Sequence, residues 1–116
     1  MVYSQSEIKD ITRRLVKMLR EMIPVETVIL FGSYAYGKPT KHSDIDLAVI
    51  SRKFNRMSDI KRIMILSDFA RRIKTRYPID IDPLGFTAEE LKMGDYFDVT
   101  AVIRESGKVV YGAVPR

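Results

Sequence analysis

Two aspartates one residue apart, Asp44 and Asp46, open a short apolar run that ends at Ile50. Side chains of a β-strand alternate between its faces, so both carboxylates point the same way, about 7 Å apart along the strand, while Ile45 and Leu47 point into a core. Neighbouring carboxylates repel each other unless a cation or a proton lies between them. Such oxygen pairs suit Mg²⁺, which keeps several waters and completes its shell with substrate phosphates. The spacing therefore predicts a magnesium site at a strand end.

A glycine and a serine that precede the aspartates could bind those phosphates. An apolar run over residues 28–31 stops at Gly32 and Ser33, and Asp44 follows Ser33 by eleven residues. Glycine lets a backbone approach a ligand closely, and a serine at the start of a short helix offers a hydroxyl and N–H groups to an anion. Either half alone is typical of a turn or a capped strand edge. Together, at this spacing, they favour a site for metal-bound phosphates.

The stretch LFGSYAYGKPTKHSDIDL, residues 30–47, resembles the signature of the nucleotidyltransferase superfamily that includes DNA polymerase β. That signature is Gly-Ser, a helical turn, a glycine (here Gly37), and Asp-x-Asp at the start of the next strand. The chain is similar above all to the minimal nucleotidyltransferases, the MNT group, which often serve as the antitoxin of a pair with a HEPN-domain toxin. The resemblance extends over roughly residues 25–111.

The resemblance implies an enzyme that transfers a nucleoside monophosphate, AMP from ATP, to a hydroxyl of a partner protein. In that chemistry Asp44 and Asp46 are catalytic and bridge two Mg²⁺ ions. The nucleoside triphosphate is bound by Gly32, Ser33 and Ser43. For an MNT-type protein the resemblance further implies a HEPN toxin as partner, a tyrosine of the toxin as acceptor, and a homo- or hetero-oligomer.

A third carboxylate is expected from the strand that follows the long helix, where the sequence reads Ile-Asp-Ile-Asp-Pro over residues 79–83. By alternation Asp80 and Asp82 face the same side of that strand, so both could approach the first pair. The apolar-Asp-apolar pattern of the family favours Asp80 as the third catalytic and metal-binding residue. Asp82, which precedes a proline and could simply end the strand, stays open as the alternative.

Length and composition predict one domain over residues 1–116, since 116 residues with 46% hydrophobic content suit a single core. No apolar run reaches the length of a membrane span and the first residues lack a signal-peptide pattern, so a cytoplasmic protein without membrane contact is expected. The lack of cysteine and the single histidine exclude thiolate and multi-histidine metal sites. The net charge of +5 suits a triphosphate or an acidic partner as well as nucleic acid.

Apolar periodicity predicts the α/β class. Ser4 and Glu7 form a capping box for a first helix, which Pro24 would stop. Strands are expected at about 26–31, 45–50, 79–84 and 108–111, and helices from 33, at 58–75, from a capping box of Thr87 and Glu90, and at about 97–104. The family resemblance implies a single small nucleotidyltransferase-type domain with a short mixed sheet covered by helices.

Two features of the helix at 58–75 concern its surface. Its apolar band, which includes Ile60, Ile63, Met64 and Ile65, is wider than one stripe. Such a band indicates either a partner face or a deeply buried helix. The basic pairs on predicted helices, among them Lys61-Arg62, are expected to lie on solvated faces.

Two other functions stay open. A steric antitoxin that only blocks its toxin would need neither the Gly-Ser turn nor the acids, so their presence argues against it. A transferase that acts on RNA or a small molecule would need a domain to hold its acceptor. A chain of this length is expected to form the catalytic domain alone, and its basic residues are scattered, so nucleic acid is not the expected partner.

Overall fold

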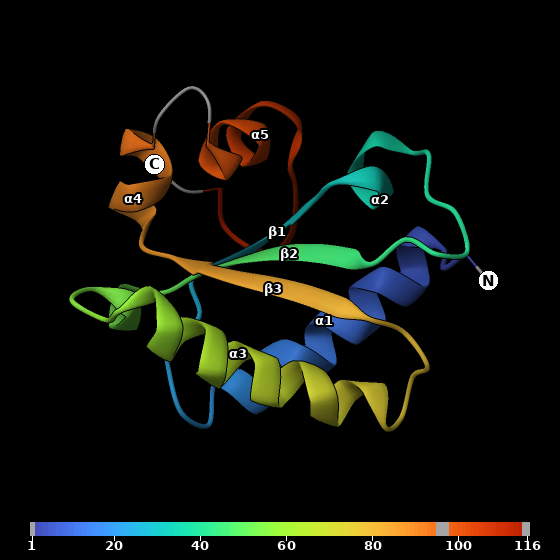
Figure 1. Ribbon diagram of the computed structural model, residues 1–116, viewed down its shortest axis with the longest axis horizontal. Coiled ribbons are helices and arrows are strands. Elements are labelled where there is room, and N and C mark those ends of the chain that lie inside the picture. The colour runs from blue at the N-terminus through green and yellow to red at the C-terminus, as the bar shows by residue number, and fades with distance from the viewer. Residues whose placement is uncertain (1, 95–97, 115–116) are drawn as a thin grey trace.

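The computed structural model describes residues 2–94 and 98–114 and shows a four-stranded sheet between helices (Figure 1). In chain order the elements are α1 (Gln5–Leu19), β1 (Thr27–Phe31), α2 (Ser33–Tyr36), β2 (Ile45–Ile50), the 3-10 turn η1 (Arg52–Phe54), α3 (Asp59–Lys74), β3 (Ile81–Phe86), α4 (Ala88–Met93), α5 (Val99–Ser106) and β4 (Lys108–Gly112). In the described part of the chain, no helix is both long and apolar enough to cross a bilayer.

The sheet is mixed, with the strand order β3-β2-β1-β4. β1 pairs antiparallel with β2 and β4, whereas β2 and β3 run parallel and are connected through α3. A parallel pair requires such a crossover, because the chain must return to the starting edge before the second strand begins. The predicted fold class, a small α/β domain with a mixed sheet covered by helices, is confirmed.

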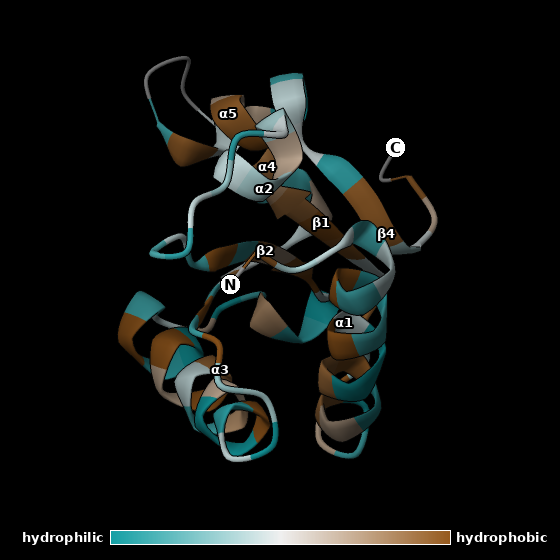
Figure 2. Cartoon of the chain, turned by 90° about the vertical axis from the view of Figure 1, so that its right-hand side faces the viewer, coloured by the Kyte–Doolittle hydropathy of each residue, from teal (hydrophilic) through white to brown (hydrophobic). Residues whose placement is uncertain are grey.

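Helices cover both faces of the sheet. Figure 2, turned by 90° from Figure 1, shows α1 and α3 beneath the strands and α2, α4 and α5 above them. The larger apolar cluster lies between the strands and the α1/α3 layer, where Leu30, Leu47 and Leu66 are fully buried. The smaller cluster joins the opposite face to α4 and α5 through Leu91 and Ile103.

Most predicted elements lie where expected. The Ser4–Glu7 capping box is present, but α1 already ends at Leu19, before Pro24. β2 has the predicted bounds, and Ser58 caps α3. The start of the last predicted helix, residue 97, lies outside the described residues, and Asp98 caps α5.

The third strand is the main correction, because β3 begins at Ile81 rather than at 79 and extends to Phe86. Ile79 lies before the strand in a turn, where its N–H bonds the carbonyl of Tyr77. Pro83 lies within β3, although a proline cannot donate a ladder hydrogen bond. The strand tolerates it because β3 is an edge strand that pairs with β2 alone.

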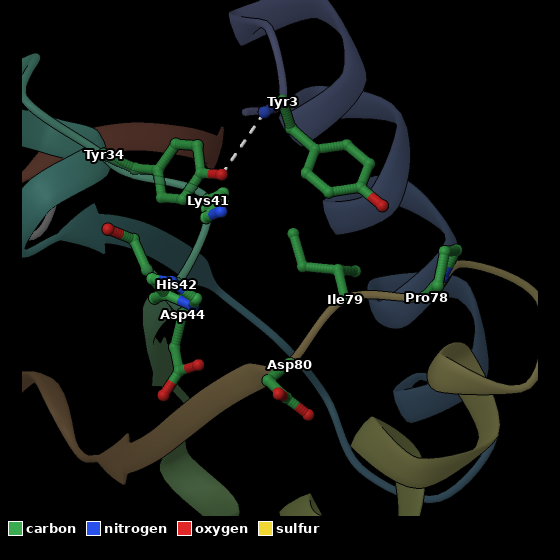
Figure 3. A pocket seen from close by; sticks show the side chains of 9 residues that line it. Tyr3, Tyr34, Lys41, His42, Asp44, Pro78, Ile79 and Asp80 are labelled. Carbon is green, nitrogen blue, oxygen red and sulfur yellow. Dashed lines mark hydrogen bonds between the residues drawn. The ribbon is translucent and has the colours of Figure 1, made fainter. Parts of the chain in front are cut away.

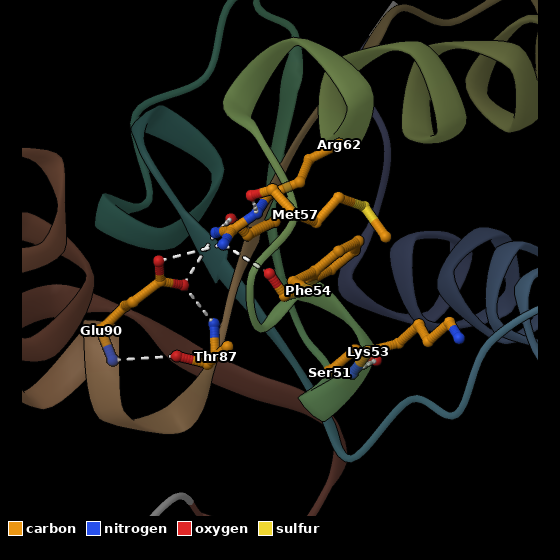
Figure 4. A network of polar contacts seen from close by, with 8 residues as sticks. Ser51, Lys53, Phe54, Met57, Arg62, Thr87 and Glu90 are labelled. Atoms are coloured by element: carbon orange, nitrogen blue, oxygen red, sulfur yellow. Dashed lines mark hydrogen bonds and ion pairs between the residues drawn. The ribbon is translucent and has the colours of Figure 1, made fainter.

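Arg62 is the second correction, since this arginine of α3 is buried rather than solvated. Its guanidinium donates to the carbonyl oxygens of Phe54, Met57 and Gly85 and to both carboxylate oxygens of Glu90, at 2.7 and 3.1 Å (Figure 4). Buried charge is tolerated only when it is paired and hydrogen-bonded, as it is here. The network ties α3, η1, β3 and α4 together at the end of the sheet opposite to the aspartates.

The apolar band of α3 is partly exposed. Ile60, Ile63 and Met64 are 71%, 53% and 67% exposed, whereas Ile65 packs against the larger core. Deep burial of the helix therefore does not explain the excess of apolar residues.

Candidate active site

Gly32 forms the floor of the site at the end of β1. Its φ of 73° lies in the left-handed region, which residues with a side chain rarely adopt. A Cβ at this position would lie 2.1 Å from Oδ2 of Asp46, so the carboxylate occupies the space that any other residue would need. The ladder explains the contact, because Phe31 pairs directly with Asp46. Glycine is thus required here both by the backbone and by the aspartate, and half-buried Ser33 opens α2 beside it.

Asp44 and Asp46 lie at the start of β2 as predicted. Ile45 and Leu47 are fully buried against the α1/α3 layer, so the alternation of the strand places the aspartates on the opposite face. Asp46 is half-buried next to Gly32, whereas Asp44, just before the strand, is exposed. The pair is therefore held on a rigid strand with its carboxylates beside the Gly-Ser turn.

Asp82 is the acid that the sheet brings beside Asp46. The parallel register pairs Asp46 with Asp82, and neighbouring strands lie about 4.8 Å apart. Both residues therefore occupy the same face at the same level. The sequence favoured Asp80 on the apolar-Asp-apolar pattern of the family, because alternation alone cannot distinguish the two acids. The register of β3 against β2 places Asp82 beside Asp46.

Asp80 has a different environment. It precedes β3, and its backbone carbonyl accepts the N–H of Ile45. Its carboxylate lies 2.5 Å from Nζ of Lys74, a residue of α3, so a lysine compensates the charge of this acid. The structure therefore brings together Asp44, Asp46 and Asp82, and it pairs Asp80 with a lysine.

The electrostatics of the cluster show uncompensated negative charge. Burial raises the pKa of Asp46 to about 6, and the charges of Asp82 and Asp44 add to the effect. Among residues 2–94 and 98–114, no Lys, Arg or His lies within ion-pair distance of these three carboxylates. A cluster of hard oxygen donors with no protein cation suits a divalent cation such as Mg²⁺.

The carboxylates of Asp44, Asp46 and Asp82 form an open donor set, which leaves positions around a metal ion for other ligands. Within the described chain, no three Asp, Glu or His side chains surround a common point closely enough to hold an ion by themselves. Mg²⁺ is usually bound in this way, by one or two carboxylates together with waters and substrate phosphates. The residues fit a metal that arrives with a phosphate ligand better than they fit a metal locked in a cage.

Ser43, the third predicted nucleotide-binding residue, is engaged in the loop before β2. Its hydroxyl oxygen accepts the N–H of Thr40 at 2.8 Å, and Oγ1 of Thr40 lies 3.4 Å away. These bonds hold the loop that leads into Asp44. The contact gives Ser43 a structural role, and its contact with a nucleotide stays a prediction.

The chain is similar to several known proteins. The family model described as "Polymerase beta, Nucleotidyltransferase" matches residues 13–112. Two proteins of Methanocaldococcus jannaschii, both named "Putative protein adenylyltransferase", are similar to the chain. MJ0128 is 41% identical over 64 residues, which cover 55% of this chain and 62% of the relative. MJ1215 is 38% identical over 68 residues, which cover 59% of this chain and 76% of the relative. The match to MJ0128 thus spans less than two thirds of that protein.

A solved structure has a similar fold. The crystal structure described as "toxin-antitoxin with AMP-PNP" superposes with a TM-score of 0.62 at 25% identity, over 87% of this chain and 73% of that one.

Proposed function

This chain belongs to the polymerase beta nucleotidyltransferase family, and from this premise we propose that it transfers AMP from ATP to a hydroxyl of a partner protein. We take the partner to be a HEPN-type toxin, whose modification in the cytoplasm neutralises it. The observation that carries the proposal is the meeting of Asp44, Asp46 and Asp82 beside the tight Gly32 turn. The relatives named as protein adenylyltransferases and the toxin–antitoxin structure with AMP-PNP support the choice of substrate and partner.

The three acids have complementary tasks in this proposal. Asp44, Asp46 and Asp82 would hold Mg²⁺, which when bound neutralises phosphate charge and makes the acceptor hydroxyl more acidic. Gly32 lets the backbone approach the terminal phosphates, and Ser33 offers them its hydroxyl. We assign the third position to Asp82 because it is the acid in register with Asp46, whereas Asp80 is paired with Lys74.

The reaction is a displacement at the α-phosphorus. The acceptor oxygen forms a bond to that phosphorus while the bond from phosphorus to the bridging oxygen breaks, and pyrophosphate leaves. The hydroxyl proton passes to a nearby carboxylate and then to water. Since phosphoryl transfer is mostly a matter of positioning and charge stabilisation, fixed acids on a strand end suffice for the protein's part.

The test uses α-labelled ATP, Mg²⁺, the purified chain and a HEPN-type protein co-expressed with it. We expect label on the partner protein, about a hundredfold slower transfer with Asp82→Asn, and a much smaller loss with Asp80→Asn. Unfolding temperatures of both variants check that the fold is intact. A greater loss with Asp80→Asn would return the third position to that residue.

The steric alternative has its own outcome in the same assay. No label on any protein, with ATP or any other nucleoside triphosphate, despite tight binding of the partner, would overturn the proposed transfer. The chain would then act by blocking its partner.

A further inference from the structure

A basic groove lies between α1 and the edge strand β4, apart from the three aspartates. It has a volume of about 460 Å³, and the residues that line it are Arg13, Val16, Lys17, Arg20, Glu21 and Tyr111. Val16 is buried and Tyr111 half-buried, whereas the four charged residues are exposed. The groove therefore presents charged side chains to a ligand beside residues that are held by packing.

The charges of the groove are mainly positive. Arg13, Lys17 and Arg20 line it together with one carboxylate, that of Glu21. Among the residues that the structure describes, Lys17, Arg20 and Glu21 take part in no ion pair. Arg13 pairs with exposed Asp10 at 3.3 Å, and such surface pairs contribute little. The groove therefore has positive charge available for an acidic ligand.

β4 borders the groove and lies at the edge of the sheet (Figure 2). Of the described strands it pairs with β1 alone, so backbone N–H and C=O groups on its outer edge have no partner strand. The strand contains no proline. A hydrogen bond of 3.3 Å from the guanidinium of Arg20 to the hydroxyl of Tyr111 connects α1 to this strand. The groove and the open strand edge are therefore adjacent, and an extended peptide could bind to both.

The spacing of the cations fits an extended chain. Lys17 follows Arg13 by four residues, about 6 Å along the helix axis. Alternate side chains of a strand point to the same face and lie about 7 Å apart. Tyr111 packs against the larger core, which lies on the α1 side of the sheet. Every second side chain of a strand added to β4 would therefore point toward that side, where acidic residues could meet Arg13 and Lys17.

α1 connects the groove to the catalytic end of the molecule. Tyr3, which precedes α1, donates its N–H to the hydroxyl oxygen of Tyr34 at 3.2 Å, beside the cavity that Asp44 lines (Figure 3). The groove begins at Arg13, eight residues after the start of the helix and so about 12 Å along its axis. A segment bound in the groove therefore leaves the aspartates open to the nucleotide and the acceptor.

We propose that the groove and the outer edge of β4 bind an extended acidic segment of the partner protein, which adds to the sheet as a further strand. The inference rests on the proposed function because it takes a protein as the partner, and it adds the docking surface and the chemistry of the bound segment. Backbone hydrogen bonds to β4 supply affinity, and carboxylates at alternate positions supply specificity through Arg13, Lys17 and Arg20.

Two other occupants fit the groove less well. A second copy of this chain, paired through its own β4, would bring the basic faces of both α1 helices together, and like charges repel. A nucleic acid would leave the open strand edge unused, because it has no peptide groups to pair with β4. An acidic peptide satisfies both the charge and the backbone.

The first test uses the full chain without nucleotide and two capped octapeptides, one of alternating glutamate and threonine and one with lysine in place of glutamate. The acidic peptide should shift the amide resonances of Val109 and Val110 in a saturable way, more weakly at high salt, and the lysine peptide should not. Strand addition should also slow hydrogen exchange of the outward-facing amides of β4. No binding of the acidic peptide at millimolar concentration, binding without slower exchange, or tighter binding of octauridylate would overturn the inference.

The second test measures the partner protein with reversed charges in the groove. Arg13→Glu with Lys17→Glu changes two exposed residues of α1. We expect the Kd of the co-expressed HEPN-type protein to rise about tenfold or more, because like charges then meet. In the transfer assay the KM for that protein should rise while kcat and the Kd of Mg²⁺–AMP-PNP stay unchanged. Lys61→Glu with Arg76→Glu, at exposed positions outside the groove, gives the same net charge and is the matched control.

The outcomes separate this inference from the proposed reaction. If the unaltered chain transfers no label, the reaction fails, whereas the peptide titration, which needs no variant, still decides whether the groove binds an acidic segment. An unchanged Kd of the partner with the folded groove variant would place the docking surface elsewhere. Equal weakening by both double variants would reduce the effect to net charge and would also overturn the inference. Unfolding temperatures check that both variants are folded.

Discussion

The two faces of the sheet have different roles, although the same strands form both. On the face toward α1 and α3, Ile45, Leu47 and Val49 of β2 are fully buried in the larger core. On the other face, β2 presents Ala48 and Ile50 to the smaller core and half-buried Asp46 to the site. Because side chains alternate along a strand, neighbouring residues belong to different environments. One strand can therefore anchor the fold and carry charge that would destabilise a core.

The difference between the faces is energetic as well as chemical. Burial of apolar area on the α1/α3 face contributes to stability at about 25 cal/mol per Å². On the site face, burial and the nearby charges of Asp82 and Asp44 raise the pKa of Asp46, so the ionised carboxylate costs stability. Substitutions on the two faces should therefore separate activity from stability.

The largest effect is expected from the double substitution Asp44→Asn with Asp46→Asn. Removal of both charges from the site face should lower transfer by about a thousandfold or more, because the remaining acid cannot hold the metal–phosphate complex. The unfolding temperature should stay the same or rise, since the repulsion is gone. The measurement is α-label transfer beside thermal unfolding. Retained transfer in this variant would rule out the metal assignment.

On the opposite face, Leu66→Ala should show the converse pattern. Leu66 of α3 is fully buried in the larger core, and its side chain lies close to Gly85 of β3. Loss of its methyl groups and the resulting cavity should lower the free energy of unfolding by about 3 kcal/mol. Urea unfolding measures this. At a temperature where the variant is folded, its KM for ATP should be unchanged, and a large change would show that the two faces are coupled.

The sequence predicted the site face in part. The spacing of Gly32, Asp44 and Asp46 was sufficient to predict that these residues lie close together, because they belong to consecutive elements joined by a short loop. The sequence could not show that Asp82 lies beside Asp46 and that Asp80 pairs with Lys74, since both depend on the register between β2 and β3 and on the position of Lys74. Both are tertiary features that local alternation does not contain.

For the fold, the apolar periodicity predicted the helices and β2. It failed for Arg62, because a charged residue on a helix is usually solvated, and the acceptors that bury this one come from η1, β3 and α4. It also misplaced β3, where Pro83 is compatible with a strand only because that strand lies at the edge. The fold class and the motif depend on local sequence, whereas the register of β3 and the burial of Arg62 depend on tertiary contacts.

A smaller effect on stability is expected from Glu90→Gln, at the end of the sheet far from the aspartates. Burial would raise the pKa of Glu90, but hydrogen bonds from Arg62 and Thr87 and the charge of Arg62 outweigh it and hold the pKa below 4.5. Loss of the carboxylate weakens a charged hydrogen bond to buried Arg62, and the free energy of unfolding should fall by about 1.5 kcal/mol. Exposed Glu89, which has no ion-pair partner among the described residues, gives the matched control Glu89→Gln. Equal effects of the two changes would contradict a specific role for the pair.

The smallest effect concerns the cost of charge at Asp46, measured in metal-free buffer. The pKa of this group is about 6 in the folded chain and 3.8 ordinarily. Between these values the folded state binds more protons than the unfolded state, so this group makes stability fall as pH rises from about 4 to 6. Because Asp46 is only half-buried, solvent screening reduces the cost at pH 7 to about 1 kcal/mol.

Asp46→Asn should therefore be more stable than the unaltered chain at pH 7 and lose that advantage near pH 4. The difference between the two proteins, from urea unfolding at both pH values, isolates Asp46 from groups such as Glu90 whose pKa is shifted in the opposite direction. Added Mg²⁺ should stabilise the unaltered chain at pH 7 more than the variant, because a bound cation offsets the same repulsion. A constant difference across pH would mean that Asp46 carries no cost, and the contrast between the two faces would then lie in chemistry alone.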